Sequence, residues 1–367
     1  MKVTISQDSL LESLKVVSRA VSGTNTLPVL GNILIRAENK KVHFFATNLE
    51  LSIATSCEAT VKNEGALTVP AKILTAYASL LDAEESVDLV VSDGATLEVK
   101  TKSSKTKIKG IAADEFPSIA TVDKGTTLDL SSKDFRSAVH KVGFAAQENS
   151  SRPILAGVYF AAEKSELRMA ATDSYRLSEK VLKLGTSVEK TSCVIPVRSV
   201  FEADRLSSGE KTVSITVGEN QVLFQVGDTQ LVSRLIDGQF PDYQQIIPKN
   251  ASTTAEVPRE AFELGVRRVS IFAKQNNQHM KLEFLGDGTL TVSTDKTEIG
   301  EEQSTIAAKV DGGSNIIALN ADYVLDVLGA LANEETIRVE LDGKMSPAVI
   351  KPLKGEDFVH LIMPLKM

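Results

Sequence analysis

An apolar, strand-like run followed by a Thr-Asn or Thr-Asp pair occurs three times in this chain. The threonines of the three pairs, Thr47, Thr172 and Thr294, are 125 and 122 residues apart. This spacing is far too long for one unit of a solenoid, and it matches the size of a whole domain. The sequence of 367 residues therefore predicts three tandem copies of one fold.

Proline markers recur with the same spacing. A Phe or Met residue precedes Pro117, Pro241 and Pro364, which are separated by 124 and 123 residues. A second pair, Pro70 and Pro196, follows a branched apolar residue and is separated by 126 residues. The agreement predicts domain copies at residues 1–122, 127–248 and 254–367, which short polar linkers connect.

Each copy shows the same order of elements. Apolar residues at helical spacing predict a first helix at residues 8–23, 133–148 and 259–275, starting near Asp8, Ser131 or Ser132, and Pro258. Paired strands are predicted at residues 29–37 with 42–46, 154–161 with 167–171, and 280–285 with 290–294. A second helix is predicted at residues 72–81, 198–206 and 321–332, before a closing run of strands. This order predicts an α+β fold with two helices on antiparallel sheet in each copy.

The composition is that of an ordinary globular protein, with 42% hydrophobic and 24% charged residues. No run of about 18 apolar residues predicts a membrane span, and the first residues lack the apolar block of a secretion signal. Cys57 and Cys193 lie in different copies, so they predict neither a disulfide framework nor a metal site. A cytoplasmic protein is expected.

The sequence offers little that predicts catalysis. It contains no GxxxxGK[ST] phosphate loop. The histidines, which are His43, His140, His279 and His360, are scattered without a partner at ligand spacing. We therefore expect no metal, no cofactor and no enzymatic activity. From the residues alone, an enzyme or small-molecule-binding protein on triplicated domains and a purely structural oligomer remain alternatives.

Four blocks of the sequence resemble a known family. They are LPVLGN at 27–32, ATDSYRL at 171–177, IDGQFPDY at 236–243 and MPLK at 363–366. These blocks, and the chain over its full length, resemble the β subunits of bacterial DNA polymerase III, the DNA sliding clamps. The resemblance implies three DNA-clamp domains per chain and a ring formed by a head-to-tail homodimer, with helices lining a hole for duplex DNA. It implies a non-catalytic processivity factor that tethers the replicative polymerase, and that binds the clamp loader and other proteins with a clamp-binding motif.

The resemblance also implies a pocket for partner peptides between the second and third domains. The matching residues are Arg152, Leu155, Thr172, Ser174, Tyr175, Arg176, Leu177, Pro241, Ile246, Leu361, Ile362, Met363, Pro364 and Leu365. The apolar members suit Leu or Phe anchors, and methionine suits a surface that receives many partners. We expect the Tyr175-Arg176-Leu177 triplet to be exposed and to grip the partner. Ser174 and Tyr175 replace the Gly-His found in many relatives, and Gln245 stands where some have arginine, so the preferred peptide is expected to differ.

Contact with duplex DNA should be loose, because the predicted lining helices are basic only relative to the rest of the chain. Their formal charges range from +2 for residues 259–275 to −3 for residues 320–334, while the whole chain carries −7. The loop at residues 22–26 lacks the arginine often found in the family. The predicted DNA-contacting residues are Lys15, Lys72, Arg136, Lys141, Asn149, Arg152, Arg198, Arg267 and Arg268.

Complementary charges favour head-to-tail pairing of two chains. Lysines of the first copy, including Lys105 and Lys107, are expected to face acidic residues of the third copy, which are Glu298, Glu301 and Glu302. Lysines on an edge strand also serve to prevent aggregation, so the charge pattern alone leaves both readings open. The resemblance adds apolar interface residues at Ile108, Ile271 and Phe272.

Overall fold

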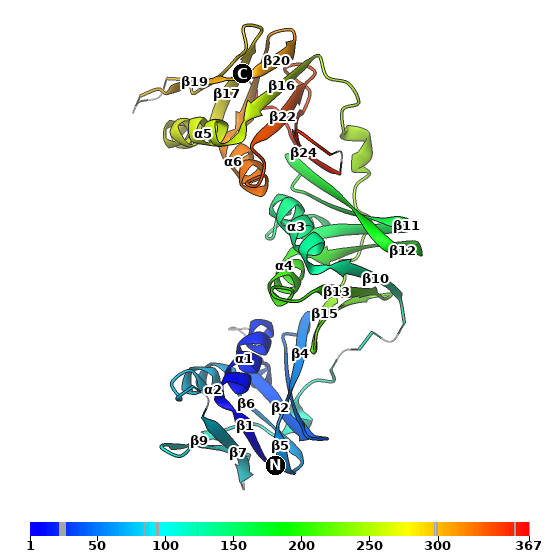
Figure 1. Ribbon diagram of the computed structural model, residues 1–367, viewed down its shortest axis with the longest axis vertical. Coiled ribbons are helices and arrows are strands. Elements are labelled where there is room, and N and C mark those ends of the chain that lie inside the picture. Colours follow the sequence, from blue (N-terminus) through cyan, green and yellow to red (C-terminus); the bar gives the residue numbers. More distant parts are fainter. Residues whose placement is uncertain are drawn as a thin grey trace. The chain divides into compact units, whose positions relative to one another are not determined.

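The computed structural model describes residues 1–366, apart from residues 22–26, 84, 93–94, 120, 123, 297, 299 and 356. The chain forms two compact units, Met1–Phe135 with Phe201–Leu235 and Arg136–Val200 with Ile236–Met367 (Figure 1). All strand pairs within the described residues are antiparallel, and helices accompany the sheets in both units. The predicted α+β class is therefore confirmed. No helix in this part of the chain has the length and apolar character needed to cross a bilayer.

The first unit contains two sheets, with strand orders β5-β1-β7-β8-β9 and β10-β13-β14-β15-β4-β3-β2-β6. The strands are β1 Lys2–Ser6, β2 Asn32–Glu38, β3 Lys41–Thr47, β4 Leu51–Glu58, β5 Thr60–Asn63, β6 Gly65–Pro70, β7 Ser86–Ser92, β8 Thr96–Lys100, β9 Lys105–Lys109, β10 Thr126–Ser131, β13 Thr212–Val217, β14 Gln221–Val226 and β15 Thr229–Arg234. Ile53 of β4 lies opposite Leu231 of β15, so strands from the first two sequence repeats share one sheet.

Two helices accompany these sheets, α1 (Gln7–Val17) and α2 (Ala71–Ala78). The buried side chains of α1 recur at helical spacing and face α2, β3 and β4. Ser6, rather than the expected Asp8, caps α1, because its Oγ accepts the N–H of Ser9 at 3.3 Å. The helix expected over residues 8–23 ends at Val17 and continues only as a short 3-10 turn, η1 (Ser18–Ala20).

The second unit also contains two sheets, with orders β11-β12-β24-β23-β22-β16-β20 and β19-β18-β17-β21. The strands are β11 Gly157–Thr172, β12 Arg176–Pro196, β16 Thr253–Pro258, β17 His279–Leu285, β18 Thr289–Ser293, β19 Gln303–Ala307, β20 Lys309–Gly312, β21 Asn315–Asn320, β22 Thr336–Leu341, β23 Ala348–Pro352 and β24 Phe358–Ile362. β12 pairs with β24, so strands of the second and third repeats share one sheet, as in the first unit.

Four helices remain: α3 (Ser132–Val142), α4 (Val197–Leu206), α5 (Arg259–Ala273) and α6 (Ala321–Ala330). α5 packs beside α6 over an apolar core that contains Phe262 and Phe284 (Figure 1). Ser131 caps α3 as one of the two expected residues, since its Oγ accepts the N–H of Asp134 at 3.0 Å. Pro258 precedes α5 and is not its first residue.

Two predicted strands begin later than expected, and for the same reason. Residues 28–31 and 153–156 form short 3-10 turns, η2 (Pro28–Gly31) and η5 (Pro153–Ala156). Each turn begins at a proline, whose fixed φ suits a helical turn and whose missing N–H cannot join a sheet ladder. The strands that follow therefore start at Asn32 and Gly157.

Candidate functional site

The turn between β11 and β12 is held by its own side chains. Thr172 Oγ1 donates to the carbonyl of Arg176 at 2.6 Å and accepts the N–H of Ser174 at 3.1 Å. Asp173 Oδ1 accepts the N–H groups of Tyr175 and Arg176, both at 2.9 Å. Ser174 has φ +81°. Short polar side chains that bond their own backbone stabilise such a turn without help from other elements.

The first repeat contains the same turn. Thr47 Oγ1 donates to the carbonyl of Leu51 at 3.2 Å and accepts the N–H of Leu49 at 3.0 Å. Asn48 Oδ1 accepts two further N–H groups, at 3.0 and 2.8 Å. Leu49 has φ +76°, close to the value of Ser174. The two turns share one backbone and one hydrogen-bond pattern, as the matched sequences predict. In the third repeat, Asp295 instead pairs with Lys281.

Arg176 connects this turn with two other segments. Its guanidinium donates to Asp173 at 2.9 Å, to Asp326 of α6 at 2.5 Å and to the carbonyl of Phe144 at 2.9 Å. The guanidinium carbon also lies 4.4 Å from the ring centroid of Tyr323. The planar guanidinium group of arginine can donate several charge-assisted hydrogen bonds and stack on an aromatic ring at the same time. Phe144 belongs to η4 (Gly143–Ala145), so one side chain joins the turn, η4 and α6.

The expectation of an exposed Tyr-Arg-Leu triplet is wrong for two of its three members. Tyr175 is 63% exposed, but Leu177 is 1% exposed, and the Arg176 side chain is 11% exposed. The reason lies in the sheet, because Leu177 pairs with Leu361 of β24 and packs into an apolar cluster with it. The turn therefore presents Ser174 and Tyr175 to solvent.

The residues predicted to bind a partner peptide divide into two groups. The exposed or partly exposed members are Arg152, Ser174, Tyr175, Arg176, Pro241, Ile246, Met363, Pro364 and Leu365. The buried members are Leu155, Thr172, Leu177, Leu361 and Ile362. Arg152 donates to Ser174 Oγ at 2.6 Å, which brings two of the exposed residues together. The C-terminal residues are fixed beside the turn, since the Met363 N–H donates to the carbonyl of Tyr175 at 2.8 Å.

The connecting segment that carries Pro241 and Ile246 is anchored by buried groups. Tyr243 of η6 (Tyr243–Ile246) donates its hydroxyl to Glu179 at 2.5 Å, and Arg168 lies 3.5 Å from the same carboxylate. Burial and the bond to Glu179 raise the pKa of Tyr243. A buried carboxylate is costly unless it is paired in this way.

His360 lies behind the turn and is fully buried. Its Nδ1 bonds with Ser178 Oγ at 2.7 Å, and its ring centroid lies 5.2 Å from that of Phe144. Burial, and to a lesser degree the charge of Arg176, lowers the pKa of His360 to about 3. The imidazole is therefore neutral at pH 7. Its Nε2 has no hydrogen-bond partner among the described residues.

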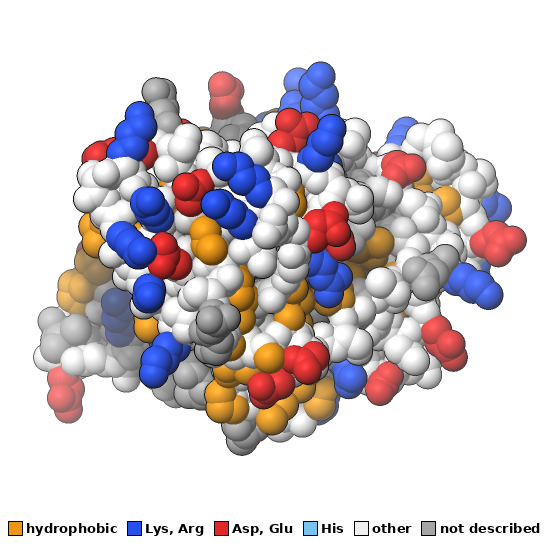
Figure 2. All heavy atoms as spheres, turned by 90° about the horizontal axis from the view of Figure 1, so that it is seen from below, with side chains coloured by type: hydrophobic (Ala, Val, Ile, Leu, Met, Phe, Trp, Pro, Cys, Tyr) orange, Lys and Arg blue, Asp and Glu red, His pale blue; other side chains and the backbone are white. Residues whose placement is uncertain are grey.

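Most predicted DNA-contacting residues are accessible. Those with exposed side chains are Lys15, Lys72, Asn149, Arg152, Arg198, Arg267 and Arg268. Arg136 and Lys141 are partly buried on α3. Arg267 already pairs with Glu263 at 2.6 Å, which leaves Arg268 the better donor on α5. On the face drawn in Figure 2, basic side chains are interspersed with acidic ones, in keeping with the weak charge expected from the sequence.

The predicted interface residues differ in accessibility. Ile271 is 61% exposed on α5, whereas Ile108 is 6% exposed and packs within its own unit. Lys105 pairs with Glu98 at 2.9 Å, and that bond lowers the pKa of Glu98. Lys107, Glu298 and Glu301 are exposed, while Phe272 and Glu302 are partly buried.

Several residues of these surfaces were missed by the sequence analysis. Phe144, Tyr323 and Asp326 contact Arg176 from distant segments, and no spacing in the sequence indicates this. Ile73 of α2 and Leu80, which lies two residues beyond the end of α2, are 55% and 83% exposed.

Comparison with known proteins agrees with the three-repeat architecture. Models of the N-terminal, central and C-terminal domains of the DNA polymerase III beta subunit match residues 1–120, 129–242 and 244–366. A beta sliding clamp of Synechococcus elongatus is 32% identical, with all of both chains covered. One from Staphylococcus aureus is 29% identical, with 100% of this chain and 99% of the relative covered.

Solved structures give the same result. The DNA polymerase sliding clamp of Bacillus subtilis superposes with a TM-score of 0.96 at 28% identity, covering 100% of this chain and 99% of that one. The DNA polymerase III β subunit of Pseudomonas aeruginosa superposes with a TM-score of 0.94 at 25% identity over all of both chains. The chain therefore belongs to the family of DNA polymerase III beta subunits, the DNA sliding clamps that act as processivity factors.

Proposed function

We propose that two copies of the chain close head to tail into a ring around duplex DNA and tether a replicative polymerase there, without catalysing a reaction. The observation that carries this proposal is the match of three consecutive sliding-clamp domains over the whole chain. Enclosure holds a protein on DNA without strong direct contacts, which suits weakly basic helices. We place this work in the cytoplasm, where bacterial DNA is replicated, and the clamp loader among the partners.

For ring closure, we propose the predicted pairing of the first domain with the third domain of another chain. The positive charge of exposed Lys107 complements the negative charges of exposed Glu298 and Glu301, and such complementarity favours one relative orientation of the two chains. Exposed Ile73, Leu80 and Ile271 supply apolar area of the kind that marks interfaces. A head-to-tail contact that closes after two chains leaves no free interface. The domain boundaries at residues 1–122, 127–248 and 254–367 belong to this proposal.

For partner binding, we propose the surface formed by Tyr175, Ile246 and Met363. These side chains are 63%, 50% and 40% exposed, and the N–H of Met363 donates to the carbonyl of Tyr175 in the turn. Large exposed apolar and aromatic groups anchor peptides, and methionine adapts to different ones. The buried members of the predicted set, such as Leu177, are proposed to support this surface from below.

The proposed enclosure of DNA is tested by comparing retention of the protein on circular and on linear DNA. Chains loaded onto closed circular duplex DNA are washed with high salt, and half of the sample is then linearised. We expect retention on circles and loss from linear DNA, because salt removes direct phosphate contacts but does not open a ring. Equal loss from both forms would refute enclosure.

A further inference from the structure

The surroundings of two turns in this chain match, as the turns themselves do. The first-repeat turn, Thr47–Leu51, joins β3 to β4, and the second-repeat turn joins β11 to β12. A strand from the next repeat ends beside each turn. There, the N–H of Arg234 donates to the carbonyl of Glu50 at 2.9 Å. The N–H of Met363 donates to the carbonyl of Tyr175 in the same way, at 2.8 Å. The first unit therefore has Glu50 and Arg234 where the second unit has two residues of the proposed peptide surface.

The segment that precedes each pair of strands is matched as well. Leu27 and Arg152 come directly before η2 and η5, with φ of −102° and −106° and ψ of 112° and 99°. In the second unit, Arg152 reaches the second-repeat turn and bonds Ser174 at 2.6 Å. Leu27 and Leu49 stand 125 residues before Arg152 and Ser174. The matched backbones therefore place the two leucines on one surface of the first unit.

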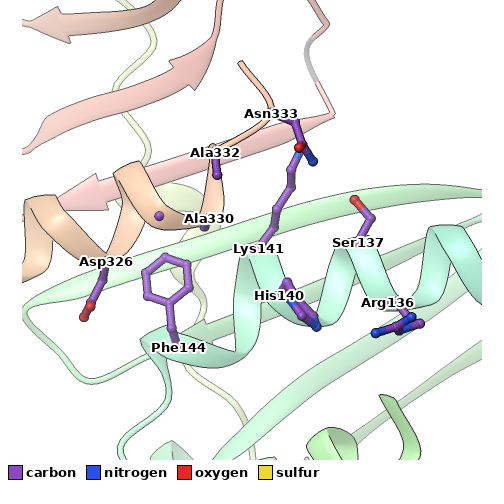
Figure 3. A pocket seen from close by; sticks show the side chains of 10 residues that line it. Arg136, Ser137, His140, Lys141, Phe144, Asp326, Ala330, Ala332 and Asn333 are labelled. Carbon is purple, nitrogen blue, oxygen red and sulfur yellow. The ribbon is translucent and has the colours of Figure 1, made fainter. Parts of the chain in front are cut away.

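The helix beside each turn is joined to the neighbouring 3-10 turn through a charged group. In the second unit, Phe144 of η4 and Asp326 of α6 project toward the same space (Figure 3), and Arg176 bonds both. In the first unit, Arg19 of η1 bonds Glu202 of α4 at 3.3 Å. Arg19 stands 125 residues before Phe144, and Glu202 stands 124 residues before Asp326. The first-repeat turn thus has an equivalent support that different side chains provide.

The first-repeat surface, formed by Leu27, Leu49, Glu50 and Arg234, differs from its counterpart in chemistry. Leu27 and Leu49 are each 49% exposed. Leu49 retains a large apolar side chain at φ +76°, a backbone conformation that glycine adopts more readily. Glu50 and Arg234 are exposed, and neither forms an ion pair within the part of the chain that the structure describes. The surface therefore combines two apolar groups with two available charges of opposite sign.

We propose that the first-repeat surface docks a short extended segment of a partner protein, with two adjacent large apolar residues between a basic and an acidic residue. The leucines contact the apolar pair, and Glu50 and Arg234 pair with the flanking charges. Two leucines give room for few side chains, which favours a short segment over a folded domain. The kind of partner rests on the peptide binding proposed for the second unit, whereas the position of the surface rests on residues of the first unit alone.

Fluorescence anisotropy on the full chain provides the test. The probes are two labelled, end-blocked peptides, Gly-Lys-Leu-Phe-Asp-Gly and Gly-Asp-Leu-Phe-Lys-Gly, which offer the charges in both directions. We expect at least one to bind, and Leu27→Ser with Leu49→Ser to weaken its binding at least tenfold. The matched control is Leu264→Ser with Met345→Ser, at residues that are 50% and 79% exposed in the second unit, and it should change the affinity less than twofold. Equal weakening by both pairs, or no binding of either peptide, would refute the proposal.

A further variant separates this surface from the one proposed in the second unit. Tyr175→Ala with Met363→Ala should leave the affinity for the probe within twofold and weaken binding of a polymerase-tail peptide. If this variant loses the probe and the leucine variant keeps it, the probe binds in the second unit and the first-repeat surface is wrong. If the polymerase-tail peptide does not bind the unmodified chain, but the probe binds through Leu27 and Leu49, only the peptide site of the second unit fails.

Leu49→Gly keeps the test available if the double variant does not fold, because glycine suits φ +76°. We expect it to weaken binding of the probe at least fivefold, and unchanged affinity would count against the surface. Glu50→Lys should weaken binding at least threefold, and a probe with glutamate in place of its lysine should restore it. If the leucine variant instead changes the sedimentation of the chain alone, a second copy covers this surface and the peptide site is wrong.

Discussion

At the scale of single residues, Arg176 has the most varied contacts around the turn. It bonds two carboxylates and a backbone carbonyl, and it stacks on Tyr323. From the sequence, Arg176 is predicted to belong to an exposed triplet that grips a partner. That assignment failed because Asp326 is 150 residues away in the chain, and no local pattern indicates such a partner.

Replacing Arg176 by lysine should lower the free energy of unfolding by about 2 kcal/mol, because a single ammonium cannot replace the three directed bonds. Urea unfolding followed by circular dichroism measures this loss. The matched control is Arg205→Lys, whose bond to Glu202 comes from a side chain that is 56% exposed. The control should change stability by less than about 0.5 kcal/mol. Equal losses in the two variants would contradict the bridging role of Arg176.

His360 predicts a pH dependence of stability. Its pKa is about 3 in the folded chain and near its ordinary value of 6.5 in the unfolded chain. Between about pH 6.5 and pH 3, the imidazole of His360 is therefore protonated in the unfolded chain and neutral in the folded chain. Stability should fall as the pH drops through this window, by up to about 1.4 kcal/mol per pH unit.

Urea unfolding between pH 7 and pH 4 checks this slope. Carboxylates contribute to it as well, so the informative quantity is the difference between the unmodified chain and His360→Gln. We expect the variant to show a smaller fall in stability over this range. Parallel curves for the two proteins would show that His360 does not carry the effect.

At the scale of elements, the C-terminal segment is part of the partner surface. The N–H groups of Met363 and Leu365 donate to the carbonyls of Tyr175 and Ala318, both at 2.8 Å. These bonds hold exposed Met363 beside Tyr175. The last residues thus act as a fixed element, although they follow the final strand.

Deleting residues 363–367 should abolish binding of a polymerase-tail peptide that contains Gln and Leu, because it removes one apolar anchor of the surface. The dimer should persist, since the proposed interface lies elsewhere. Fluorescence anisotropy measures the peptide affinity, and sedimentation measures the mass. Removing only residues 366–367 is the control and should leave the affinity within twofold. If the longer deletion binds the peptide normally, the site assignment fails.

The elements themselves were largely predictable from the sequence. Apolar periodicity located the six α-helices of the described residues and most of the strands there, because residues buried on one face of an element recur with the period of that element. Helix ends and the 3-10 turns that begin at Pro28 and Pro153 were missed, since the apolar residues after each proline read as the start of a strand. The site was only half predictable. Tyr175 is exposed as expected, but the burial of Leu177 depends on pairing with β24, which no local signal indicates.

At the scale of the whole molecule, assembly remains the main prediction. Ile271 is exposed on α5 and Phe272 is partly buried next to it. We expect Ile271→Ala with Phe272→Ala to yield monomers at low micromolar concentration, because the lost apolar area would be central to the contact. Met345→Ala, at a residue that is 79% exposed in the same unit, should remain dimeric. Sedimentation distinguishes the two outcomes, and a dimer in the double variant would contradict this interface.

The matched turns at Thr47–Leu51 and Thr172–Arg176 bear on the ancestry of the chain. A leucine at φ +76° adopts a conformation that costs about 1–2 kcal/mol for residues other than glycine, yet Leu49 shares it with Ser174. The same hydrogen bonds from the threonine and the Asn or Asp side chain offset this cost in both turns, so the two turns share a sequence pattern as well as a backbone. Duplication of one ancestral gene segment accounts for it, because each descendant inherits the main-chain course and is free to change the outward side chains. The second repeat could then acquire Tyr175 and its own binding role, while the first repeat kept the backbone conformation of the turn.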